Sequence, residues 1–381
     1  MPHLNSVFHG VLQHLPWGEF EALVERHAAD HGQRGFDSKD HLVAMLFAQF
    51  AGAMSLREIE TGLHSHVAQL YHLGARPAAR STLADANRYR PSALFSDLFT
   101  LMVGRLQRSQ RRSLAEATLL VDASVLPLPA RSAGWARFSA VACGAKMHVV
   151  YDPDADQPIY CAVTAAHVND ITAAQSMPIE AGATYVFDLG YYDYRWWAAL
   201  HQAGCRIVTR LKSNTPLAVI EQRAVAADGA ILSDRVGLLP GRQSHSRRNP
   251  MREPVREIRV RHAGGKVLRI LSNDLDAPAQ EIADLYKQRW AIELFFRWVK
   301  QTLRIKRFLG STDNAVRIQI AVALIAFLLL RLAQATQKAV ASPLAFARLV
   351  RSNLMHRRSV AALLRPPDPP PPLNLAQLAL L

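Results

Sequence analysis

The sequence has few cysteines and comparatively few acidic residues, and each shortage excludes a class of protein. The three cysteines, Cys143, Cys161 and Cys205, lack C-x-x-C spacing. This argues against a zinc cluster or a disulfide scaffold and fits a reducing cytoplasm. Lys and Arg outnumber Asp and Glu by 45 to 31, for a formal net charge of +14 over 381 residues. A polyanionic partner explains that imbalance, and nucleic acid is the first candidate.

Signals for export and membrane insertion are also missing. The opening residues M-P-H-L-N-S contain no basic segment followed by an apolar core, so no secretory signal is expected. The longest apolar run, 320–330, is too short to span a bilayer and predicts a buried helix. No long basic amphipathic helix points to a membrane surface. The sequence therefore predicts a cytoplasmic protein with no membrane partner.

The first 112 residues have a helical pattern. Asp37 or Ser38 is the expected N-cap of one helix, and Ser55-Leu-Arg-Glu58 has the capping-box pattern that opens the next. Ser81 or Thr82 is the expected cap of a short helix over 80–90. Capped helices joined by a turn are consistent with a helix-turn-helix, although small helical domains in general look the same. The candidate DNA contacts on the last helix are Arg80, Asn87, Arg88 and Arg90.

From residue 117 the pattern changes to short apolar, β-rich runs separated by helical stretches. Such alternation predicts an α/β core with a partly parallel sheet. Residues 210–275 indicate antiparallel strands around a basic loop at 241–252, and a helix over 278–306 returns to the core. Further candidate DNA contacts are Arg247, Arg248, Lys306 and Arg307. The expected parts are a helical N-terminal domain (1–112), a first part of the core (113–209), a β-rich insertion (210–277), a second part of the core (278–335), and a helical C-terminal segment with a Pro-rich tail (336–381).

Four polar side chains fall on one stripe of the predicted helix over 278–306. Tyr286, Arg289, Glu293 and Lys300 are spaced i, i+3, i+7 and i+14, and at roughly 100° per residue they share a face. Apolar side chains between 292 and 299 occupy the opposite side. A carboxylate flanked by two cations and a phenol suits a site that holds metal-bound phosphate. The alternative is an exposed helix with i,i+4 ion pairs such as Arg289–Glu293.

Two aspartates lie in or at the end of predicted strands, where they could reach the same site as Glu293. Asp122 interrupts an apolar run, and Asp188 ends another just before Gly190. Either alone could merely cap a loop. Together with Glu293 they are a suitable ligand set for two Mg²⁺ ions, which prefer carboxylate oxygens. Two such ions support in-line phosphoryl displacement, and the cations of the helix stripe would then hold phosphate oxygens.

These motifs resemble the DDE transposases of bacterial insertion sequences, in the family with a Y-x2-R-x3-E-x6-K signature (insertion-sequence family four). Every signature position is present, from Tyr286 to Lys300. The V-D-A-S segment around Asp122 looks like the family's first aspartate motif, and D-L-G-Y-Y-D-Y from Asp188 looks like the second. The resemblance covers about residues 115–335, and the N-terminal segment resembles the helical domain often attached to such enzymes.

The resemblance implies a ribonuclease-H-like catalytic core with a β-rich insertion, preceded by the all-α N-terminal domain. It implies Asp122, Asp188 and Glu293 as catalytic ligands of two Mg²⁺ ions, with Mn²⁺ able to substitute. It also implies cut-and-paste transposition: a nick at the terminal inverted repeat, a hairpin intermediate, and joining of the 3′ end to target DNA. The partners would be double-stranded DNA and a second copy in a synaptic complex, at the bacterial nucleoid. Relatives hold a flipped base with an insertion-domain Trp, but no Trp lies between 198 and 289 here.

Two other functions stay open on the sequence. The same carboxylates would serve a DNA nuclease or resolvase that cuts without strand transfer. A DNA-binding regulator with relic catalytic residues is the third hypothesis, and the intact signature argues against it.

Overall fold

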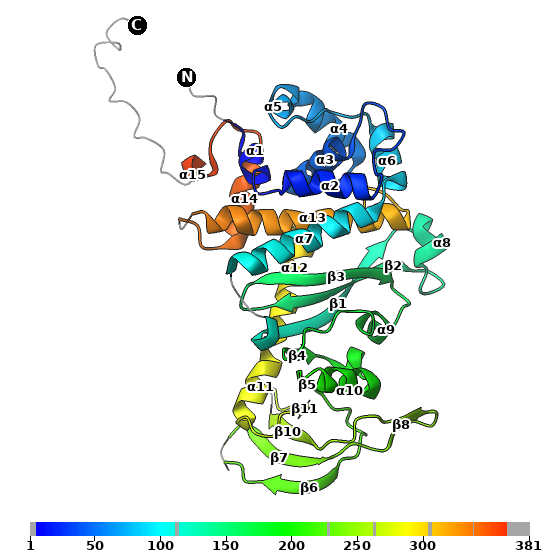
Figure 1. Cartoon of the computed structure of the whole chain (residues 1–381), viewed down its shortest axis with the longest axis vertical. Coiled ribbons are helices and arrows are strands. Elements are labelled where there is room, and N and C mark those ends of the chain that lie inside the picture. The colour runs from blue at the N-terminus through cyan, green and yellow to red at the C-terminus, as the bar shows by residue number, and fades with distance from the viewer. Residues whose placement is uncertain are drawn as a thin grey trace, which may run out of the picture.

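The computed structural model describes residues 5–110, 114–226, 229–261, 264–303, 307–337 and 339–363. The molecule is elongated, with a helical part at one end and a long sheet at the other (Figure 1). The Pro-rich tail and Lys306 lie outside the described residues.

Seven helices predicted as a group form the N-terminal part: α1 (Val7–Leu12), α2 (Trp17–Arg26), α3 (Ser38–Ala51), α4 (Leu56–Ser65), α5 (Val67–Tyr71), α6 (Arg80–Tyr89) and α7 (Ser92–Gln110). Asp37 caps α3 in a reciprocal capping box with Asp40, and Ser55 caps α4, as the sequence predicts. Gly52 ends α3 with a φ of 74°, which glycine adopts without strain. The predicted cap at position 81 or 82 is wrong, because α6 already begins at Arg80 and has no side-chain cap.

Helices from the C-terminal end of the chain complete this helical part. They are α13 (Asp313–Ala335), α14 (Pro343–Ser352) and α15 (Val360–Leu363). The two ends of the chain are joined by backbone hydrogen bonds from Val7 and Phe8 to the carbonyls of His356 and Leu354. Helix α13 runs beside α7, between the other helices and the sheet (Figure 1).

Helix α13 contains the long apolar run and is longer than that run suggested. Its 23 residues are long and apolar enough to cross a membrane by length and composition, but 83% of its most apolar window is buried inside the fold. The burial explains the composition, because a helix packed on all sides has no need of a polar face.

The central feature is one nine-stranded sheet with the order β3-β2-β1-β4-β5-β11-β10-β7-β6. Its strands are β1 (Thr118–Leu128), β2 (Cys143–Asp152), β3 (Gln157–Ala165), β4 (Thr184–Phe187), β5 (Arg206–Arg210), β6 (Ala218–Arg223), β7 (Ile231–Leu238), β10 (Val255–Arg261) and β11 (Val267–Ser272). Strands β1, β4 and β5 are parallel, and their other neighbours pair antiparallel. This is the mixed, partly parallel sheet that the alternation predicts.

Successive residues of the central strands point to opposite sides of the sheet. Leu120 and Val186 join the core under α12 (Trp290–Thr302) and α13, whereas Val121 and Phe187 join the aromatic core of α10 (Tyr194–Gln202). The remaining elements are η1 (Leu114–Glu116), η2 (Ala130–Ser132), α8 (Ala133–Ala136), α9 (Asp170–Ala174), η3 (Leu189–Tyr191) and α11 (Ala279–Gln288).

The segment predicted as a β-rich insertion contains antiparallel strands, and they extend the same sheet. Strand β11 pairs directly with β5, so β6, β7, β10 and β11 belong to the nine-stranded sheet, whereas β8 (Arg242–Ser244) and β9 (Arg247–Arg248) form a separate two-stranded sheet. Buried ion pairs hold β7, β10 and β11 together: Arg256 donates to Asp234 at 2.6 Å, and Glu257 accepts from Arg235 and Arg269. The small β8–β9 hairpin projects from this end (Figure 1). The domain boundaries given above stay a prediction.

Candidate active site

The strand register places the two predicted aspartates side by side. Val121 of β1 pairs with Phe187 of β4, and the next residue along each strand is Asp122 and Asp188. Strand β1 continues, whereas β4 ends, and Asp188 caps η3 by accepting a 2.8 Å hydrogen bond from the Gly190 N–H. Both carboxylates therefore lie at the carboxyl end of β4.

Arg289 joins the signature helix to these strands. The single helix predicted over 278–306 is in fact two helices, α11 and α12, which meet at Arg289. Its guanidinium Nη1 lies 3.4 Å from Asp122 Oδ2, and Nη2 lies 2.6 Å from Glu293 Oε1. The i,i+4 ion pair is therefore present, but it is partly buried and extends to the sheet, unlike the exposed pair of the alternative interpretation.

Charges in this cluster shift the pKa values of its members. Burial raises the pKa of Asp122 most, the Asp188 and Glu293 carboxylates also raise it, and the Ala123 N–H and Arg289 lower it, which gives a pKa of about 6. Burial lowers the pKa of Arg289, but the hydrogen bond to Glu293 and the electrostatic effects of Tyr286, Asp122 and Glu293 together outweigh burial, so the arginine pKa is raised. The three carboxylates thus act on one another electrostatically.

A cavity of about 360 Å³ opens beside the carboxylates. Its lining includes Asp122, Glu293 and Lys300, together with Ser124 and Arg297, which the sequence analysis did not select. Tyr286 lies on the other side of Arg289, with the guanidinium carbon 6.0 Å from its ring centre. Burial raises the pKa of Tyr286, so its hydroxyl stays protonated and can donate a hydrogen bond.

The donor set suits a hard divalent cation. Its ligand atoms are carboxylate oxygens only. Burial and two acidic neighbours destabilise the charged form of Asp122, and a bound cation would reduce that destabilisation. Among the described residues, no three His, Cys, Asp or Glu side chains stand close enough to hold an ion together. The guanidinium of Arg289 lies between Asp122 and Glu293, so the residues fit a metal once that side chain gives way.

Asp170 and Gly190 form part of this region, and sequence reasoning missed them. Asp170 is the first residue of α9, and its carboxylate pairs with Lys146 Nζ at 2.9 Å. A Cβ added at Gly190 would lie 3.0 Å from Asp170 Oδ2 and 3.0 Å from Asp188 Oδ1. The glycine of the D-L-G-Y motif therefore lets two carboxylates approach, and that glycine was the available signal.

Tyr191 is the other missed residue. Its hydroxyl is buried and has no hydrogen-bond partner within the part of the chain that the structure describes. Burial raises the tyrosine pKa, and the carboxylates of Asp122, Asp170 and Asp188 raise it further. The hydroxyl is therefore a proton donor held next to the acidic cluster.

The candidate DNA contacts on α6 divide into two groups. Arg80 and Arg88 are exposed. Asn87 and Arg90 are buried, at 2% and 5% exposure, so the prediction that they contact DNA is wrong. Asn87 is hydrogen-bonded to His41 of α3 at 3.0 Å. Arg90 donates to Asp30 at 3.2 Å and to a backbone carbonyl, which makes both residues part of the domain core.

The remaining candidates lie on the surface. Arg247 and Arg248 form β9, and both are exposed, as is Arg307 between α12 and α13. Their contact with DNA stays a prediction.

Comparisons with known proteins identify the family to which the chain belongs. A family described as "Transposase DDE domain" matches residues 114–329, more than half of the chain, and a "Domain of unknown function (DUF4372)" matches residues 3–76. The chain is 43% identical over 297 residues to "Putative transposase y4zB" of Sinorhizobium fredii, covering 77% of this chain and 81% of that protein. It is 29% identical over 276 residues to "Probable transposase for insertion sequence element IS5377" of Geobacillus stearothermophilus, covering 71% and 72%.

A solved synaptic complex of piggyBac transposase with hairpin DNA aligns with a TM-score of 0.48 and 10% identity, covering 96% of this chain and 83% of that one. The family match spans β1 through most of α13, which includes every residue of the carboxylate cluster. The chain therefore belongs to the DDE transposases of bacterial insertion sequences.

Proposed function

We propose that the chain cuts an insertion sequence at its terminal inverted repeats and joins the 3′ ends to target DNA, through a hairpin intermediate. The observation that carries this proposal is that Asp122 lies beside Asp188 through the β1–β4 register and is joined to Glu293 through Arg289. The strand order β3-β2-β1-β4-β5, with β1, β4 and β5 parallel, supports assigning this part to the ribonuclease-H-like fold.

Asp122, Asp188 and Glu293 would hold two Mg²⁺ ions, with Mn²⁺ able to substitute. When bound, such ions activate the attacking oxygen and stabilise the leaving oxygen of an in-line phosphoryl displacement. The protein's own contribution is to fix the carboxylates: the β1–β4 register sets two of them, and helix α12 presents the third.

The other signature residues would position the DNA. Lys300 lines the carboxylate cavity and can hold a phosphate oxygen. Arg289, once released from Asp122 and Glu293, presents a planar fork that matches phosphate. The protonated Tyr286 hydroxyl can donate to another phosphate oxygen.

The DNA partners would be the terminal repeats and the target, bound by a homodimer in a synaptic complex at the nucleoid. The net charge of +14 supports a polyanionic partner. Exposed Arg80, Arg88, Arg247, Arg248 and Arg307 remain candidate phosphate contacts.

The test is cleavage of a labelled duplex that carries the element's own terminal repeat, with Mg²⁺, with Mn²⁺ or with EDTA. The wild type should nick the repeat end, form a hairpin and join the freed 3′ end to added target DNA, only with metal. Asp122→Asn, Asp188→Asn and Glu293→Gln should each lose on the order of 10³-fold or more in rate while retaining DNA binding.

Asp284→Asn is the matched control, because it removes an exposed carboxylate from α11 without touching the cluster. It should cleave as the wild type does. Cleavage that survives in all three cluster variants would refute the assignment, and cutting without joining would identify a nuclease.

A further inference from the structure

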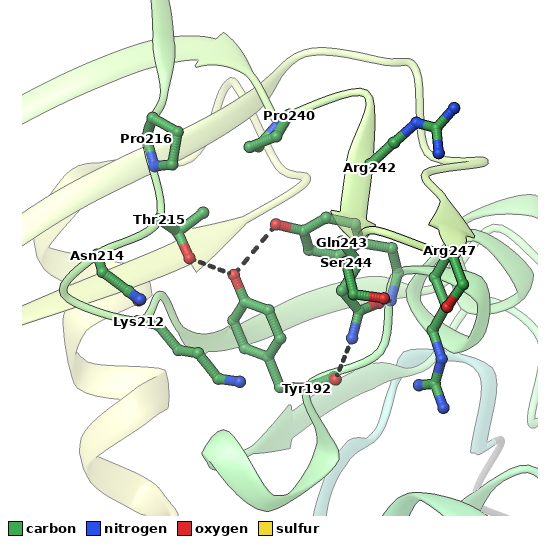
Figure 2. A pocket seen from close by; sticks show the side chains of 12 residues that line it. Tyr192, Lys212, Asn214, Thr215, Pro216, Pro240, Arg242, Gln243, Ser244 and Arg247 are labelled. Atoms are coloured by element: carbon green, nitrogen blue, oxygen red, sulfur yellow. Dashed lines mark hydrogen bonds between the residues drawn. The ribbon is translucent and has the colours of Figure 1, made fainter.

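A second and larger cavity, of about 620 Å³, lies between the segment after η3 and the β8–β9 hairpin (Figure 2). Three cationic side chains line it, Lys212, Arg242 and Arg247. None of the described residues in its lining carries a carboxylate. The cavity therefore has a positive field suited to an anion.

An aromatic ring forms part of its wall. The Tyr192 hydroxyl is hydrogen-bonded to Thr215 Oγ1 at 2.7 Å and to the Tyr194 hydroxyl at 3.2 Å, which fixes the ring (Figure 2). The Lys212 ammonium lies 4.4 Å from the ring centre. A fixed ring beside several cations is the combination with which proteins bind single nucleic-acid strands.

The cationic hairpin is fastened next to the candidate catalytic aspartate. Gln243 of β8 donates to the Tyr192 carbonyl at 2.9 Å and accepts from the Tyr194 N–H at 2.8 Å. The buried Asn249 closes the base of the hairpin through the Pro240 carbonyl at 2.9 Å. Tyr192 follows Asp188 by only one turn of η3, so the cavity has a fixed position relative to the carboxylates.

Contacts within the protein occupy only part of the hydrogen-bonding capacity of Arg242 and Arg247. Arg247 pairs with Asp193 at 3.6 Å but keeps 58% of its side chain exposed. Arg242 donates to the His245 carbonyl at 2.6 Å through one nitrogen, and its residue is exposed. Each guanidinium therefore retains donors for a phosphate.

We propose that this cavity binds the sugar–phosphate backbone of one unpaired DNA strand next to the cleavage site. Lys212, Arg242 and Arg247 contact its phosphates, and Tyr192 forms the wall along which the strand passes. The fixed Tyr192 ring beside these cations favours an unpaired strand over a duplex. The proposal rests on the proposed function, because it takes the strand from DNA held at the carboxylate cluster.

The test compares two full-length double variants that each remove two positive charges. Arg242→Gln/Arg247→Gln changes the cavity. Arg261→Gln/Lys266→Gln is the matched control, with both residues exposed at the end of β10 and start of β11 that lies away from the hairpin. Binding of a fluorescent single-stranded oligonucleotide and of the same sequence as a duplex is measured in EDTA over a range of salt concentrations.

For the single strand, log of the association constant falls with log salt concentration. In the cavity variant this negative slope should be shallower by about 1.4, twice the ~0.7 expected per phosphate contact. That difference corresponds to about 25-fold weaker binding at ~0.1 M salt. The control should keep the wild-type slope, and Arg242→Lys/Arg247→Lys should restore it. Circular dichroism of each variant verifies folding.

The proposal would be overturned if the cavity variant and the control lost equal affinity for the single strand. It would also be overturned if the cavity variant lost affinity for the duplex alone. Displacement of the strand by inorganic triphosphate at an affinity equal to that of the oligonucleotide would assign the cavity to a free anion and also overturn it. Because binding is measured without metal, the two proposals fail separately. A wild type that binds the strand as described but never cuts its repeat would refute the proposed function and leave the strand site standing.

Discussion

Gly190 is the residue at which the acidic cluster tolerates least change. A methyl group there would lie 3.0 Å from oxygens of both Asp170 and Asp188. Asp170 is held by Lys146 and Asp188 by the Gly190 N–H, so neither carboxylate can retreat without losing a partner. We predict that Gly190→Ala shifts Asp188 and slows repeat cleavage about 10- to 100-fold. Single-turnover cleavage rates at saturating protein measure the effect.

The control is Gly134→Ala. Gly134 lies in α8, and an added Cβ meets no atom within 4 Å. This variant should cleave at the wild-type rate. A Gly190→Ala enzyme that cleaves as fast as Gly134→Ala would show that the crowding at Asp188 has no catalytic consequence.

At the residue scale, the sequence predicts the type of site but not the contacts within it. The spacing from Tyr286 to Lys300 identifies one face of a helix, and the strand ends identify two aspartates. The bridge from Arg289 to Asp122 joins residues far apart in the chain, which no local pattern encodes. The same reason explains the error at Arg90, whose partner Asp30 precedes it by 60 residues.

The packing of α3 against α6 depends on an uncharged histidine. Burial and the charge of Arg90 together lower the pKa of His41 from 6.5 to about 3, although the hydrogen bond with Asn87 opposes this change. The unfolded imidazole titrates near 6.5, so below that pH unfolding takes up a proton. The stability that His41 contributes is therefore present above about pH 6.5 and is lost as pH falls toward 3.

We predict that lowering the pH from about 7.5 to about 5 costs the wild type about 2 kcal/mol more free energy of unfolding than it costs His41→Gln. Urea denaturation at the two pH values measures the difference. The control His64→Gln changes an exposed histidine of α4 and should lose as much as the wild type. Equal pH dependence in wild type and His41→Gln would show that His41 does not titrate as described.

At the element scale, the sequence does not predict where one helix ends and the next begins. The polar stripe continues across Arg289 without a Pro or Gly, so it predicts one helix. The structure has two, although Arg289 itself keeps helical angles of −50° and −28°. The residues preserve their spacing across this boundary, and Arg289 contacts both Asp122 and Glu293.

Over the whole molecule, Arg351 of α14 connects the helical part with α12, the helix that contains Glu293. Its Nε donates to the Phe50 carbonyl near the end of α3 at 3.0 Å, and its Nη2 donates to the Thr302 carbonyl at the end of α12. A cation at two helix C-termini satisfies carbonyls that have no partner within the helices. We predict that Arg351→Met lowers the free energy of unfolding by about 1–3 kcal/mol, as measured by chemical denaturation.

Arg348→Met is the comparison for this prediction, because Arg348 is an exposed residue of the same helix. It should change the free energy of unfolding by no more than about 0.5 kcal/mol. Hydrogen exchange at the last turns of α3 and α12 should accelerate only in Arg351→Met. Equal destabilisation by both substitutions would mean that the carbonyl contacts contribute nothing measurable.

At the scale of the molecule, the sequence predicts the division into helices, a partly parallel core and antiparallel strands. It does not predict that the last group joins the same sheet, because Leu271 of β11 pairs with Thr209 of β5 only once the chain has folded back. Nor does it show that α13 and α14 return to pack against α3. Both depend on contacts between segments that are distant in the chain.

The continuity of the nine-stranded sheet has a mechanical consequence. Backbone hydrogen bonds run without interruption from β3 beside the helices to β6 at the far end. A continuous β-sheet resists bending between its strands far more than two domains that are joined only by a linker. The carboxylates on β1 and after β4 therefore keep their separation from β6 during a reaction cycle, and any change of shape on binding falls to the DNA and to the β8–β9 hairpin, which forms a sheet of its own.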